Sequence, residues 1–282
     1  MSMAEACEDL AAEAAELRAL VRGAVPEAVT PFEGWRVRDV VEHMVTIDRL
    51  ATLSLTDAAA FNAEQGRFVE GTKPPSADRP RAEAFARIKA YETSRLAFLS
   101  WAQLLAAWDA GLAELIAAGR GAAEDAKVGW FGPPMRARTL INARQMEVWG
   151  YGQDVFDLMR ARRAEGERLR NVAEFGVRTM GFCFANHGLP APDPKPFVAL
   201  TSPGGATWAW NDPGADSRVE GSAVDFCRVA VQRRNVADTA LKVTGEAART
   251  WMRIAQCIAG PPAEGPAPGV RAWDLPGAAT DA

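Results

Sequence analysis

Apolar residues recur at helical spacing along the first part of the chain. Residues 3–22 place alanine, leucine and valine side chains on one helical face, and GWRVRDVVEHM opens a second helix with its own apolar face. Residues 81–118 predict one long helix or two in tandem, and residues 137–160 predict a further helix. Gly- and Pro-containing segments such as TKPPSADRP and VGWFGPPMRA separate these runs. The pattern predicts a mainly α fold that begins with a four-helix up-and-down bundle.

The pattern changes in the last third of the chain. A helix is expected near residues 167–186, and HGLPAPDPKP then forms a proline-rich boundary. Beyond it, PFVALTSPGGATWAWND predicts a β-hairpin, and the sequence that follows predicts helix, strand and helix. We therefore expect a helical bundle with the candidate site, a small α+β domain and a loose tail rich in Pro, Gly and Ala, at residues 1–187, 188–262 and 263–282.

Composition and charge narrow the classes of function. A net charge of −4 and a pI of about 5.4 argue against a general nucleic-acid or membrane-surface binder. No apolar run reaches the roughly 18 residues of a membrane span, and the acidic N-terminus does not resemble a secretion signal. The four cysteines are scattered without a CxxC pair, which favours a reduced, cytoplasmic protein.

The helix predicted at residues 137–160 carries polar residues at a spacing that suits chemistry. In RQMEVWGYGQDV, the side chains of Glu147, Tyr151 and Asp154 return to one helical face. Only two histidines occur in the chain, and His43 on the second helix can face Glu147 across a bundle. The two residues suit a metal site or an acid/base pair. A phenol with its ordinary pKa of about 10 binds metal poorly but can donate a hydrogen bond to an oxyanion. A buried histidine beside surface acids is the plainer alternative.

Aromatic and basic residues supply candidates for substrate binding. Trp130 and Phe131 lie in a Gly/Pro loop that leads into the same helix, and loop aromatics at a bundle often line a ligand pocket. Trp149 is one of nine tryptophans, most of which we expect in the core. The adjacent Arg233 and Arg234 suit recognition of a carboxylate, although two solvated arginines are the alternative.

The order of the motifs GWRVRDVVEHM, WFGPPM, GQDV and FCRVAVQRRNVADTALKVTG resembles one family over about residues 8–262. The sequence is similar to the actinobacterial DinB-type, mycothiol-dependent maleylpyruvate isomerase-like proteins, and more closely to the branch described as metal-binding. The resemblance implies a DinB-like four-helix metal-binding bundle followed by a small α/β C-terminal domain. In that family a divalent metal is held by a histidine matching His43, a glutamate matching Glu147 and a second histidine in an HGQD motif. This chain reads YGQD, so Tyr151 stands at the third ligand position.

Three hypotheses follow for the protein, and the first two give His43, Glu147 and Tyr151 a part in catalysis. In the first, zinc or nickel activates mycothiol for an isomerase or thiol-transferase reaction, held by the histidine, the glutamate and either Asp154 or Tyr151. The tyrosine at position 151 argues against a tightly bound metal. In the second, a converted enzyme isomerises or cyclises a small substrate without metal, using the same residues as acid and base. In the third, the protein binds a small molecule without catalysis. The sequence reveals neither the substrate nor the oligomeric state.

Overall fold

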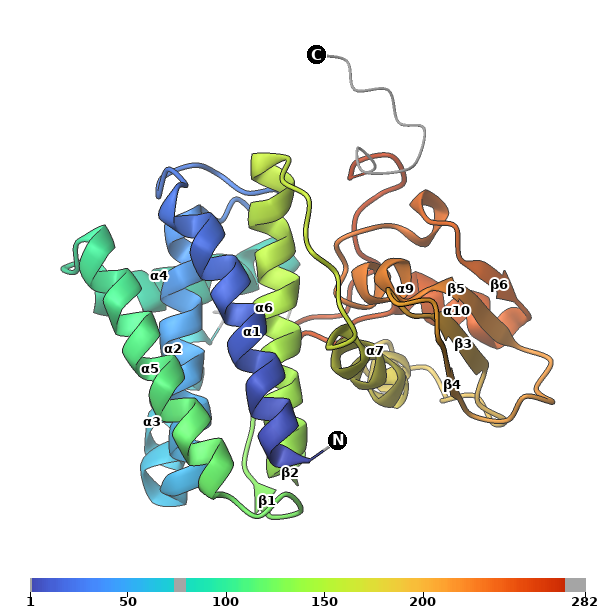
Figure 1. Cartoon of the computed structure of the whole chain (residues 1–282), viewed down its shortest axis with the longest axis horizontal. Helices are drawn as coiled ribbons and strands as arrows, with labels where there is room; N and C mark the ends of the chain where they lie inside the picture. Colours follow the sequence, from blue (N-terminus) through green and yellow to red (C-terminus); the bar gives the residue numbers. More distant parts are fainter. Residues whose placement is uncertain (1, 74–79, 272–282) are drawn as a thin grey trace. The chain divides into compact units, whose positions relative to one another are not determined.

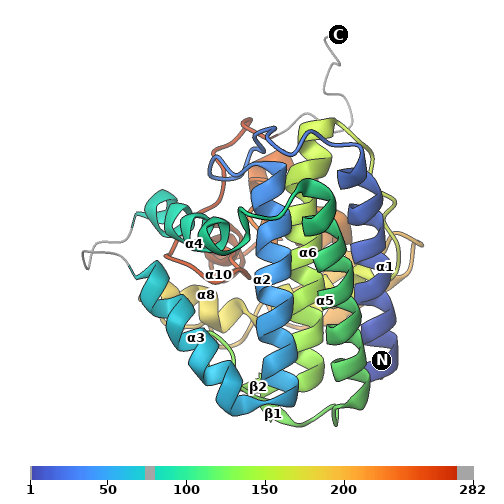
Figure 2. The same cartoon turned by 90° about the vertical axis from the view of Figure 1, so that its left-hand side faces the viewer.

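The computed structural model describes residues 2–73 and 80–271, and the chain falls into two compact units, Met1–Arg162 and Arg163–Ala282. Four helices of the first unit run alongside one another as a bundle (Figure 1, Figure 2). These are α1 (Met3–Arg22), α2 (Val37–Thr56), α5 (Trp101–Gly121) and α6 (Ala137–Met159). Helix α1 packs against α6, and α2 packs against α5. The predicted four-helix bundle is confirmed.

Local chemistry of the chain sets where the bundle helices begin and end. Helix α1 starts at a capping box, in which the Ser2 hydroxyl accepts from the Glu5 N–H and the Glu5 carboxylate accepts from the Ser2 N–H. Ser100 and Gln103 form the same arrangement at the start of α5. Helix α6 ends at Arg160, which adopts a left-handed backbone conformation with φ of 49°.

Large apolar side chains fill the interior of the bundle. Burial of one such side chain contributes roughly 1.5–3 kcal/mol to the free energy of unfolding. Those with no exposed surface include Leu10, Leu17, Val40, Met44, Leu104, Trp108, Leu140 and Ile141. The apolar faces read from the sequence are therefore the core faces, and the charged groups buried among them need partners.

Two further helices, α3 (Ala58–Thr72) and α4 (Arg81–Leu96), pack on α2 beside the bundle (Figure 2). The sequence pattern did not predict α3, because the residues that it buries, Phe61 and Phe68, are too few to form a clear stripe. The segment 81–118 forms two helices, α4 and α5. Among the described residues no single helix is long and apolar enough to cross a membrane, and α4 with α5 meets that criterion only as a pair bent by 101°.

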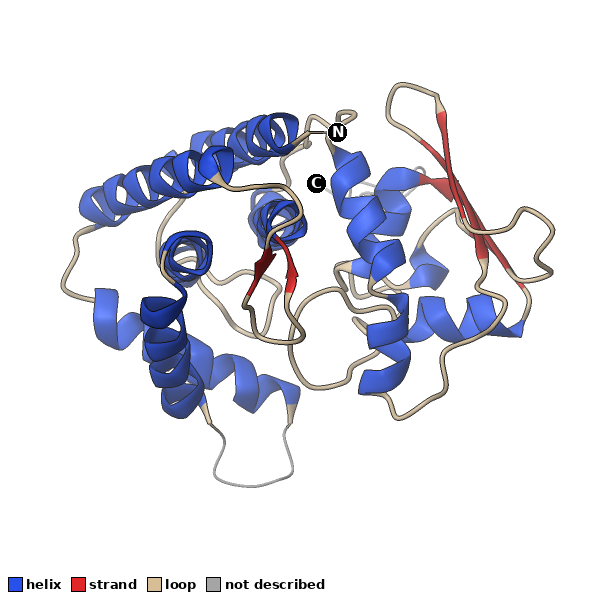
Figure 3. Ribbon diagram, turned by 90° about the horizontal axis from the view of Figure 1, so that it is seen from below, coloured by secondary structure: helices blue, strands red, loops and turns tan. Residues whose placement is uncertain are grey.

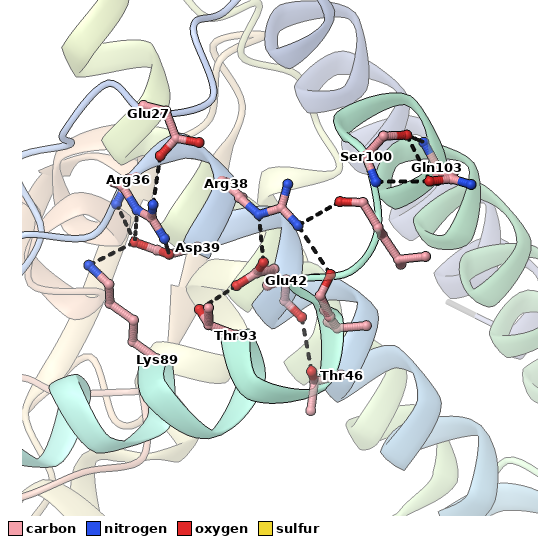
Figure 4. Close-up of polar contacts among 12 residues, drawn as sticks. Glu27, Arg36, Arg38, Asp39, Glu42, Thr46, Lys89, Thr93, Ser100 and Gln103 are labelled. Atoms are coloured by element: carbon pink, nitrogen blue, oxygen red, sulfur yellow. Dashed lines mark hydrogen bonds and ion pairs between the residues drawn. The ribbon is translucent and has the colours of Figure 1, made fainter.

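Polar contacts from α2 hold the C-terminal end of α4 (Figure 4). The Arg38 guanidinium donates to the carbonyl oxygens of Leu96 at 3.1 Å and Leu99 at 2.9 Å. These carbonyl groups lie at and just beyond the helix end, where intrahelical partners run out. Arg38 also donates to Glu42 Oε1 at 2.7 Å, and the Thr93 hydroxyl donates to Glu42 Oε2 at 2.6 Å. One buried carboxylate and one guanidinium thus fix two helices against each other.

The second unit combines helices with a four-stranded sheet in the order β4-β3-β5-β6 (Figure 3). The antiparallel pair of β3 and β4 is the predicted hairpin. Strand β5 pairs in parallel with β3, and β6 pairs antiparallel with β5. The strands are β3 (Phe197–Thr201), β4 (Thr207–Trp210), β5 (Arg218–Ser222) and β6 (Lys242–Thr244). The helices are α7 (Leu169–Arg178), α8 (Met180–Asn186), α9 (Ala223–Ala230) and α10 (Glu246–Ile254), with a 3-10 helix at Val236–Asp238. A small α+β domain therefore follows the bundle, as predicted, with β5 as the strand that the sequence pattern missed.

The compact units divide between residues 162 and 163, ahead of the boundary that the sequence suggests at residue 187. Helix α7 packs against α9 and α8 packs against α10, so both cluster with the sheet. Part of the predicted loose tail is hydrogen-bonded: Gln232 donates to the Ala263 carbonyl at 2.7 Å, and the Gly269 N–H donates to Asp238 at 2.9 Å. The rest of that tail, 272–282, and most of TKPPSADRP, 74–79, lie outside the described residues.

We expect Arg38→Met to loosen the end of α4 while the bundle stays folded. The change removes the donor to two helix-end carbonyl groups and leaves the buried Glu42 without its cation, at a cost of about 1–3 kcal/mol. Hydrogen–deuterium exchange at α4 amides should rise about tenfold. Arg22→Met, at an exposed arginine in the last turn of α1, is the matched control. Equal exchange in the two variants would show that these contacts do not hold α4.

Candidate functional site

The structure brings together His43 of α2 and Glu147 of α6, the two residues that the sequence singled out first. His43 Nε2 lies 3.3 Å from Glu147 Oε2. The His43 side chain is 6% exposed and the Glu147 side chain is 15% exposed, so Glu147 is the more accessible of the pair. The distance is long for a hydrogen bond. The Nε2 atom is therefore the loosely held side of the imidazole ring.

The other side of the ring is held by Glu92, a residue that sequence reasoning missed. Glu92 Oε1 lies 2.8 Å from His43 Nδ1, and the glutamate has no exposed surface. Its second oxygen, Oε2, is buried without a hydrogen bond to any residue that the structure describes. Glu92 comes from α4, and no motif in that segment marks it. Its place follows from the docking of α4 on α2, which sequence periodicity does not specify.

A buried arginine holds the Glu147 carboxylate by Oε2, the same oxygen that lies near the His43 ring. Arg144 Nη1 lies 2.6 Å from Glu147 Oε2, and Arg144 Nε donates to Asp48 Oδ1 at 3.0 Å. The Trp108 indole N–H donates to the other Asp48 oxygen at 3.1 Å. Arg144 and Asp48 have no exposed surface. Sequence reasoning missed this pair too, although Arg144 lies one turn before Glu147 on the same helix.

Burial and neighbouring charges set the protonation states of this cluster. Burial disfavours the charged imidazolium, but the carboxylates of Glu92 and Glu147 outweigh it and raise the pKa of His43 to about 9. Burial raises the pKa of Glu92, and His43 opposes that rise. Burial also works to raise the pKa of Glu147, but Arg144 and His43 hold it below the ordinary value. At neutral pH the cluster therefore holds a cationic imidazolium between two carboxyl groups.

Tyr151 forms an aromatic wall beside the imidazole ring. Its ring lies 4.7 Å from the His43 ring, stacks on Trp35 at 5.4 Å and 13°, and meets Phe32 edge-on at 5.2 Å. These contacts bury all but 4% of the tyrosine. The residue at the expected third ligand position thus packs as a ring against aromatic neighbours.

The donor set does not fit the metal centre that the resemblance implies. A catalytic zinc needs about three protein ligands. Among the described residues no group of three or more His, Cys, Asp or Glu side chains is placed to hold a metal ion. His43 and Glu147 converge, but the nearest oxygen of Glu147 already contacts Arg144. Asp154 is buried on α6 without joining such a group.

The other candidate residues lie in different surroundings. The loop that carries Trp130 and Phe131 joins the short strands β1 (Lys127–Val128) and β2 (Met135–Arg136). Trp130 stacks on Phe61 at 6.1 Å, and Phe131 packs on Phe68 at 5.2 Å, so both contact α3. Their role in substrate binding stays a prediction.

Trp149 is buried in α6. Arg233 and Arg234 belong to the second unit and are buried, in contrast to the solvated alternative. Arg233 donates to the Val231 carbonyl at 2.6 Å, and Arg234 donates to the Arg233 carbonyl at the same distance. For these residues too, substrate binding stays a prediction.

Comparisons with known proteins point to one family. The family model of the mycothiol maleylpyruvate isomerase N-terminal domain matches residues 7–156. Two uncharacterized proteins, from two strains of Mycobacterium tuberculosis, are each 36% identical over 263 residues, which cover 91% of this chain and 96% of theirs. The crystal structure of the mycothiol-dependent maleylpyruvate isomerase has 17% sequence identity and a TM-score of 0.50, over 83% of this chain and 90% of that chain. A mutant of that enzyme gives a TM-score of 0.49. The structural likeness shows a shared fold.

The raised pKa of His43 predicts a pH-dependent contribution to stability. The folded value of about 9 exceeds the ordinary 6.5, so this contribution is complete below pH 6.5 and is lost as pH rises through 9. We expect the free energy of unfolding of the wild type, minus that of His43→Gln, to fall by about 3 kcal/mol over this interval. Urea denaturation at a series of pH values measures the difference. A difference that stays constant with pH would contradict the assigned protonation state.

The identity of residue 151 predicts metal content. We expect the purified wild type to hold far less than one equivalent of zinc or nickel, and Tyr151→His to bind more, because histidine supplies the third ligand beside His43 and Glu147. Inductively coupled plasma mass spectrometry after dialysis against each metal measures both proteins. Near-stoichiometric zinc or nickel in the wild type would contradict this prediction, because it would show that the site binds metal without a histidine at position 151.

Proposed function

Since the chain belongs to the family of the mycothiol maleylpyruvate isomerase N-terminal domain, we propose that it is a thiol-dependent, isomerase- or transferase-like enzyme that acts on a small organic molecule without a metal. One observation carries the proposal. Glu92 holds His43 Nδ1 at 2.8 Å, whereas Nε2 lies 3.3 Å from the partly exposed Glu147. The arrangement holds a proton donor in place and leaves its more loosely held nitrogen beside the partly exposed Glu147. Mycothiol is the thiol that the family description suggests.

The His43 imidazolium supplies the positive charge that the reaction needs. A neighbouring cation lowers the pKa of a thiol and favours the thiolate nucleophile. The thiolate adds to an electron-poor carbon–carbon double bond, forming a C–S bond, and the displaced electron pair moves onto the conjugated carbonyl oxygen. The Nε2–H of His43 stabilises that oxyanion. Rotation about the new single bond and loss of the thiolate then give the isomer and return the thiol unchanged.

The other residues of the cluster act through His43. Glu92 orients the imidazole ring and keeps it protonated, so we assign it as a positioning residue. Arg144 holds Glu147 at 2.6 Å and keeps that carboxylate ionised. The Tyr151 ring closes one side of the imidazole and shields it from water. All four cysteines of the chain are free thiols, which supports a reducing, cytoplasmic setting for the enzyme.

A second candidate is an isomerase or cyclase that needs no thiol. The aromatic wall of Phe32, Trp35 and Tyr151 beside the imidazole favours it, since these rings suit a flat apolar substrate. In that reaction His43 donates its Nε2 proton to the substrate and the substrate's own proton returns to the ring. The two candidates share the same acid and differ only in the need for a thiol.

Turnover assays with maleylpyruvate, in the presence and absence of mycothiol, test the proposal. We expect thiol-dependent turnover that His43→Gln lowers by about 100- to 10,000-fold. Because the acid must be protonated, activity should fall as pH rises above about 9. Glu92→Gln removes a carboxylate that raises the pKa of His43, so its activity should fall at lower pH than in the wild type. Glu70→Gln, at an exposed glutamate of α3, is the matched control.

Each outcome of this assay decides between the candidates. Turnover that needs no thiol favours the isomerase or cyclase reaction. Binding without turnover, unchanged by His43→Gln, contradicts both reactions and favours the non-catalytic hypothesis. If the activity of Glu92→Gln depends on pH as that of the wild type does, Glu92 does not act as a positioning residue for His43.

A further inference from the structure

A cavity of about 340 Å³ lies between α2, α3 and α4, and none of the residues of the His43 cluster lines it. Its floor is apolar, because Leu50 and Phe68 are buried there and the Tyr91 ring meets the Phe68 ring edge-on at 5.2 Å. Charged side chains from all three helices also line it, namely Arg49, Glu64 and Arg95. An apolar surface with a few charged groups at one side is typical of a site for a small organic molecule.

Positive charge exceeds negative charge in this lining. The carboxylate of Glu64 is already held by Arg67, through a hydrogen bond and ion pair, and that contact keeps the pKa of Glu64 below its ordinary value. Arg95 Nη2 is 3.4 Å from Glu64 Oε1, a weak contact, and its guanidinium lies over the Tyr91 ring at 4.7 Å. Arg49 forms no ion pair within the part of the chain that the structure describes, and it is exposed. The lining thus holds two arginines and one carboxylate, and that carboxylate is already paired with Arg67 outside the lining.

From this geometry we infer that the cavity binds a small amphipathic anion, an aromatic or short aliphatic molecule with a single carboxylate. The apolar body lies against Leu50, Phe68 and Tyr91. The carboxylate lies between Arg49 and Arg95, whose guanidinium groups match the two oxygens of a carboxylate. An uncharged molecule of the same shape gains only the apolar contacts, so charge decides what the cavity selects.

The cavity is distinct from the proposed reaction site, although the two share α4. Glu92 is buried against His43, whereas its neighbours Tyr91 and Arg95 line the cavity. No residue of the cavity takes part in the proposed proton transfer. The inference therefore stands whether or not the protein proves to be a thiol-dependent enzyme.

Ligand-detected NMR titrations of the full chain with benzoate, and with benzamide as the uncharged probe of the same shape, test the inference. We expect a Kd for benzoate on the order of 1 mM, at least about tenfold below that for benzamide. Arg49→Ala and Arg95→Ala should each weaken benzoate binding about five- to tenfold. Both side chains are exposed, so neither change threatens the fold. Arg22→Ala, at the exposed arginine of α1, should leave the Kd unchanged.

Two results overturn the inference, and one further variant separates it from the proposed function. Equal affinity for benzoate and benzamide would show that the cavity does not select a negative charge. Equal affinity of Arg49→Ala, Arg95→Ala and Arg22→Ala for benzoate places the probe elsewhere. Glu147→Gln changes the reaction site on α6 and leaves the contact between His43 and Glu92 in place. In that variant, benzoate binding at wild-type strength supports the cavity as the site. Loss of binding assigns the probe to the reaction site and contradicts the inference.

Discussion

The burial of a charged imidazole between two carboxyl groups is the constraint on which the functional part of this protein depends. His43 is almost without exposed surface, and moving a cation out of water is costly unless nearby groups compensate it. Glu92 and Glu147 provide that compensation from two different helices. Glu147 in turn needs Arg144, and Arg144 needs Asp48. Each buried charge therefore requires the next one.

This chain of charges explains why α4 lies where it does. A helix that buried only Phe85 and a few partly covered apolar side chains would pack weakly on α2. Glu92 gives α4 a partner deep in the bundle, and Arg38 ties down its C-terminal end. The same contacts that dock α4 fix the tautomer and orientation of His43. The contacts that stabilise α4 against the bundle are thus the same contacts that orient His43 for the proposed reaction. The structure places two carboxyl groups beside the His43 imidazole where the family resemblance implies a metal ion.

Helical spacing within long amphipathic segments predicted the bundle. The resemblance to a known family, more than spacing, pointed to the contact between His43 and Glu147 that the structure contains. Sequence reasoning missed α3, whose buried residues are few, and β5, a short strand containing Glu220 and Gly221. It also missed Glu92 and the partnership of Arg144 with Asp48, since these depend on how helices dock and not on local pattern. The substitution at position 151 was readable from the motif. That the tyrosine ring stacks on Trp35 was not, because residues 35 and 151 meet only in the folded protein.

The proposed chemistry depends on the protonation state of His43, and NMR titration of the histidine side chains measures that state directly. The chain contains only two histidines, so His187→Gln assigns the His43 resonances without ambiguity. We expect His43 to titrate with a pKa of about 9 and Glu92→Gln to lower this value. A pKa at or below the ordinary 6.5 in the wild type, or an imidazole kept from titrating by a bound metal, would contradict this expectation.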